Sequence, residues 1–176
     1  ALPISERDSG DQLDAAALLY LSEILGGSPF TSVFARDLSF DTQVAVDTWA
    51  SYGGTSLDDT TFGIGMIPAA GVTLDDAEAA LDASLARFLE EGVDAARFER
   101  LRTQLRASEI YALDNVEGLA RRYGAALSSG LTVQDVQDWP NVLQQVTPDD
   151  VMRVARDVLD RDNAVTMWVV ADREGI

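Results

Sequence analysis

Apolar residues recur at helical spacing near the start of the chain, and they predict a helix over residues 11–25. Leucines of one face follow each other at three and four positions: Leu18, Leu21 and Leu25. Such spacing places side chains on one side of a helix, where they face a core. Gly26 and Gly27 follow directly, and glycine is common at helix C-termini. The pattern therefore predicts a core-facing helix that stops at the glycine pair.

The next segments predict a hairpin. After a short helix over residues 30–38, a strand is expected over residues 43–50, because β-forming residues dominate that stretch. Turn-forming residues separate it from a second, antiparallel strand over residues 60–67, which Pro68 ends. A nearly all-apolar run over residues 164–171 predicts a third strand of the same sheet.

Helices occupy the middle of the chain and the segment before the final apolar run. Cap residues and glycine stops predict three of them: Thr73 to Gly92, one beginning at Asp94, and Val116 to Ser128. Residues 131–146 are expected to form one or two short helices that break at Pro140, because proline lacks the backbone donor. Thr147 and Pro148 then predict a last helix, with an N-cap hydroxyl before a proline at the first helical position.

These elements predict a single α/β (α+β) domain over residues 1–176. Its expected architecture is a two-layer sandwich, with helices on one face of a mainly antiparallel sheet. The chain has 176 residues, 47% of them hydrophobic, which is enough for one packed core. It begins without Met and reads at first like the end of a strand, so we expect a fragment of a longer protein. No targeting signal is visible.

The composition excludes several classes of function. Thirty acidic residues against thirteen basic ones give a net charge of −17, which repels nucleic acid and anionic membrane surfaces. The sequence contains no Cys, His or Lys. A Ser-His-Asp triad, a histidine-ligated zinc helix, a cysteine nucleophile and a Schiff-base lysine are therefore all excluded for this chain.

Three further patterns have both a chemical and a structural interpretation. Acidic pairs such as Asp149–Asp150 suggest glycosidase or metal-binding carboxylates, but their places at turns and helix ends favour capping and solvation. The arginines between Arg97 and Arg106 suggest an anion site, whereas their spacing around an apolar helix face favours simple exposure. Gly26–Ser28 suggests a phosphate-binding turn, but a helix stop explains the same glycines.

Several short motifs, taken together, resemble the insulinase/pitrilysin zinc metallopeptidase family, which includes bacterial processing proteases. The similarity lies in their order and spacing: Ile24–Ser28 at a helix end, Phe34–Leu38 in a short helix, the strand from Gln43, Glu90–Val93, Gly130, and Val146–Val151. It extends over about residues 13–170, nearly the whole chain. The resemblance implies a domain built like one of the homologous α/β halves of these peptidases.

In that family only one half carries the inverted zinc motif H-x-x-E-H, which needs two imidazoles and a carboxylate. A chain without His resembles the other half, the non-catalytic C-terminal one. The resemblance implies no cofactor in this chain and zinc in an H-x-x-E-H-bearing partner half, on the same polypeptide or on a second subunit. It implies a peptide substrate and a bacterial protein, and it leaves the compartment unassigned, with the periplasm favoured over the cytoplasm. The net charge of −17 adds that no nucleic acid or membrane partner is expected.

The resemblance also singles out Arg36 and Gln43 for substrate binding. In the family this half presents an Arg towards the zinc site and a Tyr seven positions later; Arg36 fits the Arg, and Gln43 stands in place of the Tyr. A phenol hydroxyl would donate to the oxyanion that forms during attack on the peptide bond, and a Gln amide donates with a different reach. Three interpretations stay open: Gln43 substitutes for the Tyr, the register of the motif differs by one or two residues, or the peptidase activity is weak or lost. The alternative for Arg36 is a surface ion pair with Asp37 or Asp41.

Two functions follow from the resemblance. The first is the substrate-binding half of a zinc-dependent peptidase, which encloses peptide in a chamber and pairs its backbone with a free sheet edge. The net charge of −17 would then favour basic peptides. The second is a catalytically inert scaffold that holds partner subunits. An unrelated α/β binding module is a third interpretation, in which the resemblance is coincidental.

We predict that this chain alone binds no stoichiometric zinc. Without His or Cys only carboxylates remain, and carboxylates suit Ca²⁺ or Mg²⁺ better than Zn²⁺. Metal analysis of the dialysed chain is expected to find well below one zinc per molecule. A single tightly held zinc per chain would contradict the prediction.

Overall fold

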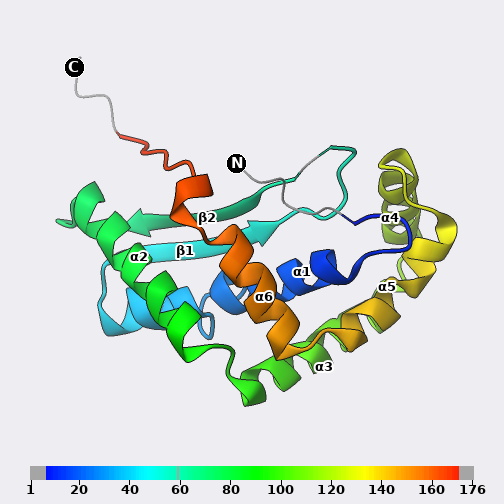
Figure 1. Ribbon diagram of the computed structural model, residues 1–176, viewed down its shortest axis with the longest axis horizontal. Helices are drawn as coiled ribbons and strands as arrows, with labels where there is room; N and C mark the ends of the chain where they lie inside the picture. The colour runs from blue at the N-terminus through cyan, green and yellow to red at the C-terminus, as the bar shows by residue number, and fades with distance from the viewer. Residues whose placement is uncertain (1–6, 59, 171–176) are drawn as a thin grey trace.

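The structure consists of a two-stranded hairpin and helices that cover one of its faces (Figure 1). The computed structural model describes residues 7–58 and 60–170. The strands are antiparallel: β1 (Ala45–Tyr52) and β2 (Phe62–Pro68). The helices follow in chain order: α1 (Leu13–Gly26), η1 (Ala35–Asp41), α2 (Leu74–Glu91), α3 (Ala95–Ala112), α4 (Val116–Ser128), α5 (Val133–Gln145), α6 (Pro148–Val158) and η2 (Arg161–Asn163). None of the helices in these described ranges is long and apolar enough to cross a membrane.

The hairpin has one covered face and one exposed face. Ile64 and Met66 of β2 pack against the core, whereas Ile67 is 51% exposed. Trp49 lies opposite Gly65, and its indole ring occupies the space that a Cβ at residue 65 would need. The expected α+β fold class, with helices on one face of an antiparallel sheet, is confirmed.

Helix α1 lies at the centre of the molecule and packs mainly against β1 and α6 (Figure 1). Its small residues Ala15–Ala17 are completely buried, which lets the neighbouring elements approach closely. At its C-terminal end a Cβ on Gly26 would overlap the backbone of Trp49 and Ala50. Gly27 has the ordinary right-handed φ of −70°. Gly26 is therefore required by the close approach of α1 to β1, and the pair does not form a left-handed helix end.

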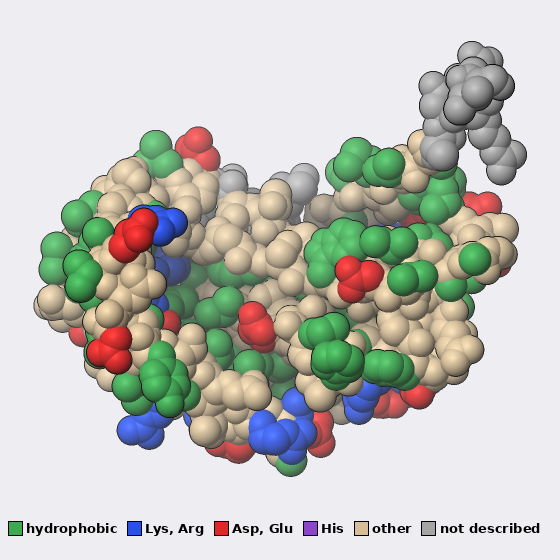
Figure 2. Space-filling view, turned by 180° about the vertical axis from the view of Figure 1, so that it is seen from behind, with side chains coloured by type: hydrophobic (Ala, Val, Ile, Leu, Met, Phe, Trp, Pro, Cys, Tyr) green, Lys and Arg blue, Asp and Glu red, His purple; other side chains and the backbone are tan. Residues whose placement is uncertain are grey.

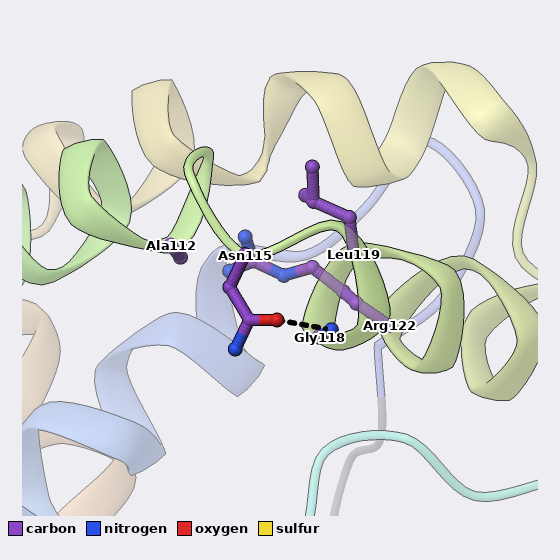
Figure 3. Close-up of a pocket in the computed structure, with 5 residues that line it drawn as sticks. All are labelled: Ala112, Asn115, Gly118, Leu119 and Arg122. Carbon is purple, nitrogen blue, oxygen red and sulfur yellow. Dashed lines mark hydrogen bonds between the residues drawn. The ribbon is translucent and has the colours of Figure 1, made fainter.

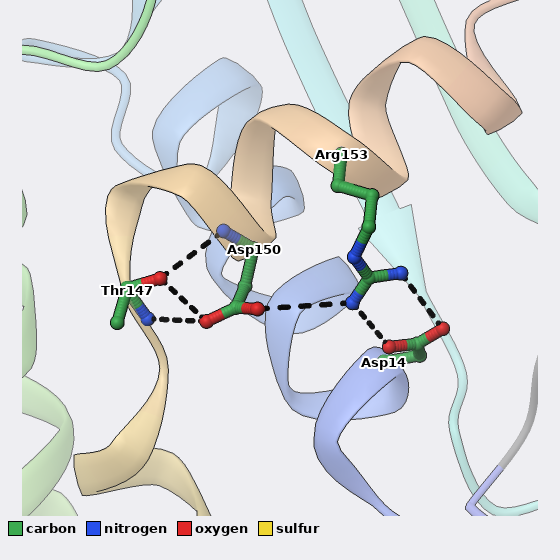
Figure 4. Close-up of polar contacts among 4 residues, drawn as sticks. All are labelled: Asp14, Thr147, Asp150 and Arg153. Carbon is green, nitrogen blue, oxygen red and sulfur yellow. Dashed lines mark hydrogen bonds and ion pairs between the residues drawn. The ribbon is translucent and has the colours of Figure 1, made fainter.

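Side-chain caps begin the later helices at the predicted residues. Thr73 caps α2 through its hydroxyl. Thr147 and Asp150 form a reciprocal cap on α6, in which the Thr147 hydroxyl accepts from the Asp150 backbone N–H at 3.2 Å and the Thr147 N–H donates to the Asp150 carboxylate at 3.0 Å (Figure 4). Arg153 then bridges Asp150 to Asp14 of α1. The cap of α6 is thereby tied to the central helix.

An aromatic pair joins α1 to α3 and α5. The rings of Tyr20 and Phe98 stack with centroids 5.0 Å apart, and both side chains are buried. The Tyr20 hydroxyl donates to the Leu143 carbonyl of α5 at 3.0 Å, as a buried phenol requires. Burial also raises the pKa of Tyr20. One side chain of the central helix thus contacts two further helices.

The predicted third strand is wrong for the residues that the structure describes. Residues 164–170 pair with neither β-strand, and Ala171 lies outside the described residues. Val165 is 93% exposed, and the segment contacts α2 instead, where Trp168 Nε1 donates to Glu78 at 3.1 Å. A β-forming composition reports a local preference, but a strand also needs a free edge in the correct register.

The predicted break at Pro140 is also wrong, because α5 (Val133–Gln145) continues through it. A proline inside a helix costs about 3 kcal/mol through its missing donor and a steric clash. Val136, Trp139 and Leu143 are buried on either side of the proline, and each such side chain contributes about 1.5–3 kcal/mol by burial. Tertiary packing therefore outweighs the local preference of proline and keeps the helix continuous.

A buried carboxylate ties the N-terminal segment to the start of α5. Asp135 is 6% exposed, and it accepts hydrogen bonds from the backbone of Gly10 at 3.0 Å and of Thr132 at 2.8 Å. The hydroxyls of Ser9 and Thr132 donate to it as well. These hydrogen bonds, foremost that of the Thr132 hydroxyl, hold the pKa of Asp135 well below its usual value. The carboxylate is therefore charged and fully paired in the folded state.

We predict that Gly26→Ala destabilises the fold by about 1–3 kcal/mol or more, the usual range for overpacking. The added methyl group would overlap the backbone of β1, which cannot withdraw without separating the hairpin from α1. Gly124→Ala is the matched control, because a Cβ at that position in α4 would meet no atom within 4 Å. Its expected effect is a gain of up to about 1 kcal/mol in helix propensity. Urea unfolding compares the two, and equal stabilities would contradict the prediction.

A second stability prediction concerns Asp135→Asn, which should lower the free energy of unfolding at pH 7 by about 1.5–3 kcal/mol. Because the pKa of Asp135 is lower in the folded than in the unfolded chain, its contribution is complete above the unfolded value of about 3.9. It is lost as pH falls from there towards the folded pKa. The difference between wild type and variant should therefore shrink below about pH 4.

Asp149→Asn serves as the control for this titration, because Asp149 is an exposed acid in the first turn of α6. Its effect on stability should be within about 0.5 kcal/mol at pH 7. Unfolding curves from acidic to neutral pH measure all three proteins. A stability difference for Asp135→Asn that does not change with pH would contradict the titration argument.

Candidate functional site

Arg36 lies near the start of η1, and its side chain is exposed. Its backbone N–H donates to the Ser32 carbonyl at 3.2 Å, which fixes the turn that carries it. Across the described residues its guanidinium makes no hydrogen bond and no ion pair. The surface ion pair with Asp37 or Asp41, considered from the sequence, is therefore absent from this part of the chain. The guanidinium is available to a group from outside the chain.

Asp37, the residue next to Arg36, is turned inward. Its carboxylate is 8% exposed and accepts a hydrogen bond from the Ser84 hydroxyl at 2.8 Å. Arg87 of the same helix, α2, forms an ion pair with it at 3.3 Å. These contacts hold η1 against α2, and they leave the neighbouring Arg36 on the outer side of the turn.

Helix η1 is a π-helix, and it ends close to Gln43. The Thr42 backbone N–H and hydroxyl both donate to the Asp37 carbonyl, at 3.2 and 2.7 Å, which closes the wide last turn. Gln43 follows with a φ of 55°, a left-handed conformation that costs a residue other than glycine roughly 1–2 kcal/mol. The Gln43 side chain is exposed, and no hydrogen bond links it to Arg36 among the described residues. The two predicted binding residues thus lie at opposite ends of η1.

Arg97 is a neighbour of Arg36 that sequence patterning assigned to an exposed face. Its guanidinium donates to the Ile24 carbonyl at 3.2 Å and to the Thr31 carbonyl. The Thr31 carbonyl directly precedes the Ser32 carbonyl that holds the backbone of Arg36. Burial, followed by the nearby charge of Arg36, lowers the pKa of Arg97. Arg97 therefore fastens the loop between α1 and η1 and adds positive charge beside Arg36.

The remaining arginines of α3 have two kinds of environment. Arg100 and Arg106 are exposed, as the helix pattern predicts. Arg102 is half-buried, because it donates to the Val146 carbonyl at 2.7 Å and lies over the Phe98 ring at 4.8 Å. Figure 2 shows basic side chains gathered along the lower edge of the molecule, the edge on which α3 lies in Figure 1.

Glu23 is a residue that sequence reasoning did not select. It lies in the last turn of α1 and is half-buried, and its Oε2 occupies the space that a Cβ on Gly27 would need. Burial raises the pKa of Glu23. No described residue donates a hydrogen bond to its carboxylate or forms an ion pair with it. The available signal in the sequence was an acid in the last turn of a helix, which the helix dipole disfavours.

The glycine-rich turn after α1 is closed by its own hydrogen bonds. The Ser28 hydroxyl oxygen accepts from the backbone of Phe30 at 3.4 Å and of Thr31 at 3.2 Å. The Thr31 hydroxyl donates to the same oxygen at 2.9 Å. The backbone donors that a phosphate would need are thus already engaged, so the turn is structural.

A cavity of about 160 Å³ lies where α3 meets α4, lined by Ala112, Asn115, Gly118, Leu119 and Arg122 (Figure 3). The Asn115 side chain accepts from the Gly118 N–H at 2.9 Å, which caps α4. The Arg122 guanidinium forms an ion pair with both carboxylate oxygens of Glu109 at 2.5 Å. The polar side chains that line the cavity, Asn115 and Arg122, are therefore engaged in local structure, and they give no indication of a ligand.

Two of the acidic pairs, Asp75–Asp76 and Asp149–Asp150, each contribute one carboxylate to a helix cap. Asp76 accepts from the Thr73 hydroxyl at 2.6 Å, and Asp150 accepts from Thr147 in the reciprocal cap described above (Figure 4). The hydroxyl of Thr147 is the main cause of the lowered pKa of Asp150. Within residues 7–58 and 60–170, no three His, Cys, Asp or Glu side chains are grouped so as to hold a metal ion.

Comparison with known proteins identifies a family whose sequence model matches this chain. The sequence model of the family described as Peptidase M16 inactive domain matches residues 6–105. No curated protein matches the sequence. Solved structures, in contrast, share the fold over most of the chain, and three of them are informative.

One is the inactive peptidase domain of a protein from Bordetella parapertussis that is described as a zinc protease. It is 17% identical to this chain and superposes with a TM-score of 0.82, and the match covers 98% of this chain and 90% of that chain. A protein from Bordetella pertussis, described as a zinc protease, is 19% identical with a TM-score of 0.76, over 90% and 86% of the two chains. A Helicobacter pylori protease is 17% identical with a TM-score of 0.78, over 89% of this chain. This chain spans only 37% of the Helicobacter protein.

Proposed function

The chain belongs to the family of M16 peptidase inactive domains, and we propose that it is the substrate-binding, non-catalytic half of a zinc-dependent peptidase. A partner half with the H-x-x-E-H motif, on the same polypeptide or on a second subunit, would hold the zinc and close a chamber over the peptide. This chain has no His, the residue that ligates zinc in that motif. Hydrolysis of the peptide bond is therefore assigned to the partner half.

The observation that carries this proposal is the exposed guanidinium of Arg36, which has no partner among the described residues and lies where the resemblance places a substrate-binding arginine. Other exposed arginines, such as Arg106, also lack an acidic partner in the described chain, so the place of Arg36 distinguishes it. The nearest acid in sequence, Asp37, is engaged by Ser84 and Arg87. A planar guanidinium donates through a fixed fork of N–H groups, which suits the carbonyl and carboxylate groups of a peptide.

Gln43 supplies the second donor of the proposed site. Its exposed side chain lies two residues before β1, on a left-handed backbone that directs the chain from η1 into the hairpin. We assign its amide to a peptide carbonyl, in the place where the resemblance puts a tyrosine hydroxyl. The amide N–H donates a hydrogen bond to an oxyanion as a phenol does, although from a shorter and differently aimed side chain.

A catalytically inert scaffold is the second candidate function, and Gln43 is the observation that favours it. A domain that no longer assists peptide hydrolysis has no need of the phenol donor. The scaffold would use the same fold to hold a partner half without contributing to turnover. Cleavage assays on the assembled protein separate the two functions, because only the substrate-binding half affects the rate.

We predict that Arg36→Ala lowers kcat/KM of the assembled peptidase by about tenfold or more, equivalent to about 1.4 kcal/mol of lost transition-state binding. The stability of this chain should change by less than about 1 kcal/mol, because the exposed guanidinium makes no contact that folding requires. Peptide cleavage and thermal melting of wild-type and variant assemblies test both statements.

Arg106→Ala is the matched control, since Arg106 is also an exposed arginine but lies on α3, away from η1 in the sequence. It should change neither cleavage nor melting. Unchanged cleavage in Arg36→Ala together with a large fall in melting temperature would show that Arg36 is structural. An assembly that forms with a zinc-bearing partner but whose cleavage is insensitive to Arg36 and Gln43 would favour the scaffold.

A further inference from the structure

Glu23 is a half-buried acid whose negative charge no described residue stabilises. The carboxylate is half-buried in the last turn of α1, against the Cα of Gly27. No hydrogen bond or ion pair engages it within the described part of the chain. Only burial acts on its pKa, which is raised, and no neighbouring cation compensates.

Three physical effects oppose a negative charge at this position. Half-burial removes part of the water around the carboxylate, and no described residue replaces the lost hydrogen bonds. The C-terminal end of a helix carries partial negative charge, and α1 has no basic residue in its last turn. The chain as a whole carries −17. A neutral glutamine of the same shape would fit the space with less cost, so the fold alone does not account for a glutamate.

A cation from outside the chain would remove this cost. Arg97 is the nearby cation on α3, but its guanidinium is directed to the Ile24 and Thr31 carbonyls. Neither Arg97 nor another described residue forms an ion pair with Glu23. An external guanidinium or ammonium group would form a charge-assisted hydrogen bond with the carboxylate.

We propose that Glu23 is a specificity subsite that binds a basic side chain, Arg or Lys, of the bound peptide. The inference rests on the proposed function and deepens it. Glu23 lies at the end of α1 from which the chain runs through Gly27 into the loop that carries Arg36. In this proposal, a peptide held by Arg36 extends along this stretch of the chain to Glu23. Gly27 belongs to the subsite, because any side chain there would displace the carboxylate.

The test uses two fluorescein-labelled decapeptides that differ only at the central residue, which is Arg in one and its neutral analogue citrulline in the other. The remaining residues of both peptides have uncharged side chains. Fluorescence anisotropy measures their binding to the 176-residue chain. Wild type should bind the Arg peptide about tenfold more tightly, the ratio expected of one charge-assisted hydrogen bond. Glu23→Gln should bind both peptides equally. Its melting temperature should equal or exceed that of wild type, which a purely structural glutamate would not allow.

Glu91→Gln is the matched control, since Glu91 is an exposed acid in the last turn of α2. It makes the same change of net charge and should keep the tenfold preference. Equal binding of both peptides by wild type would overturn the subsite and leave the proposed function standing. Failure to bind either peptide would count against both. A preference that survives Glu23→Gln, with weaker association of the zinc-bearing half, would assign the cation to that half and overturn the inference.

Discussion

The close approach of α1 to β1 at Gly26 is the constraint on which the other features depend. Because the helix contacts the backbone of the strand with no side chain between them, the direction in which the chain leaves α1 is set by the hairpin. The loop that follows is then fastened by Arg97 to the Ile24 and Thr31 carbonyls. The position of η1, and with it that of Arg36, follows from a contact between backbones in the core.

Two buried carboxylates fix the positions of further elements around this core. Asp37 holds η1 to α2 through Ser84 and Arg87, and Asp135 holds the N-terminal segment to α5. Each of these carboxylates is nearly inaccessible, and each has the partners that burial demands. Both carboxylates serve the fold and are engaged by neighbouring side chains or backbone groups.

Two charged groups near the end of α1 are different, because the fold does not satisfy them. Among the residues that the structure describes, the exposed Arg36 has no anionic partner and the half-buried Glu23 has no cationic partner. Departures from local consistency in a well-packed protein are expected at functional positions. A peptide that offers a carbonyl or carboxylate to one and a basic side chain to the other would satisfy both, and it would be bound in one direction only.

The sequence by itself determined the features that depend on neighbours along the chain. The caps at Thr73 and Thr147 and the core-facing side of α1 follow from spacing and hydrogen bonds within a few residues, so patterning found them. It also identified Arg36 and Gln43 through motif order, whereas their roles in binding stay predictions. The strands of the hairpin were predicted with ends one or two residues away from those observed, since strand ends depend on pairing.

Only the tertiary structure decided what depends on distant partners. Residues 164–170 have the composition of a strand, but in the described chain they pair with neither strand of the hairpin and contact α2 instead. Pro140 has the chemistry of a helix breaker, but the burial of its neighbours outweighs it. Gly26 is explained by a strand more than twenty positions away, and the inward turn of Asp37 by a helix farther still. Local patterns report preferences of a few kcal/mol, and packing between distant segments is strong enough to confirm or reverse them.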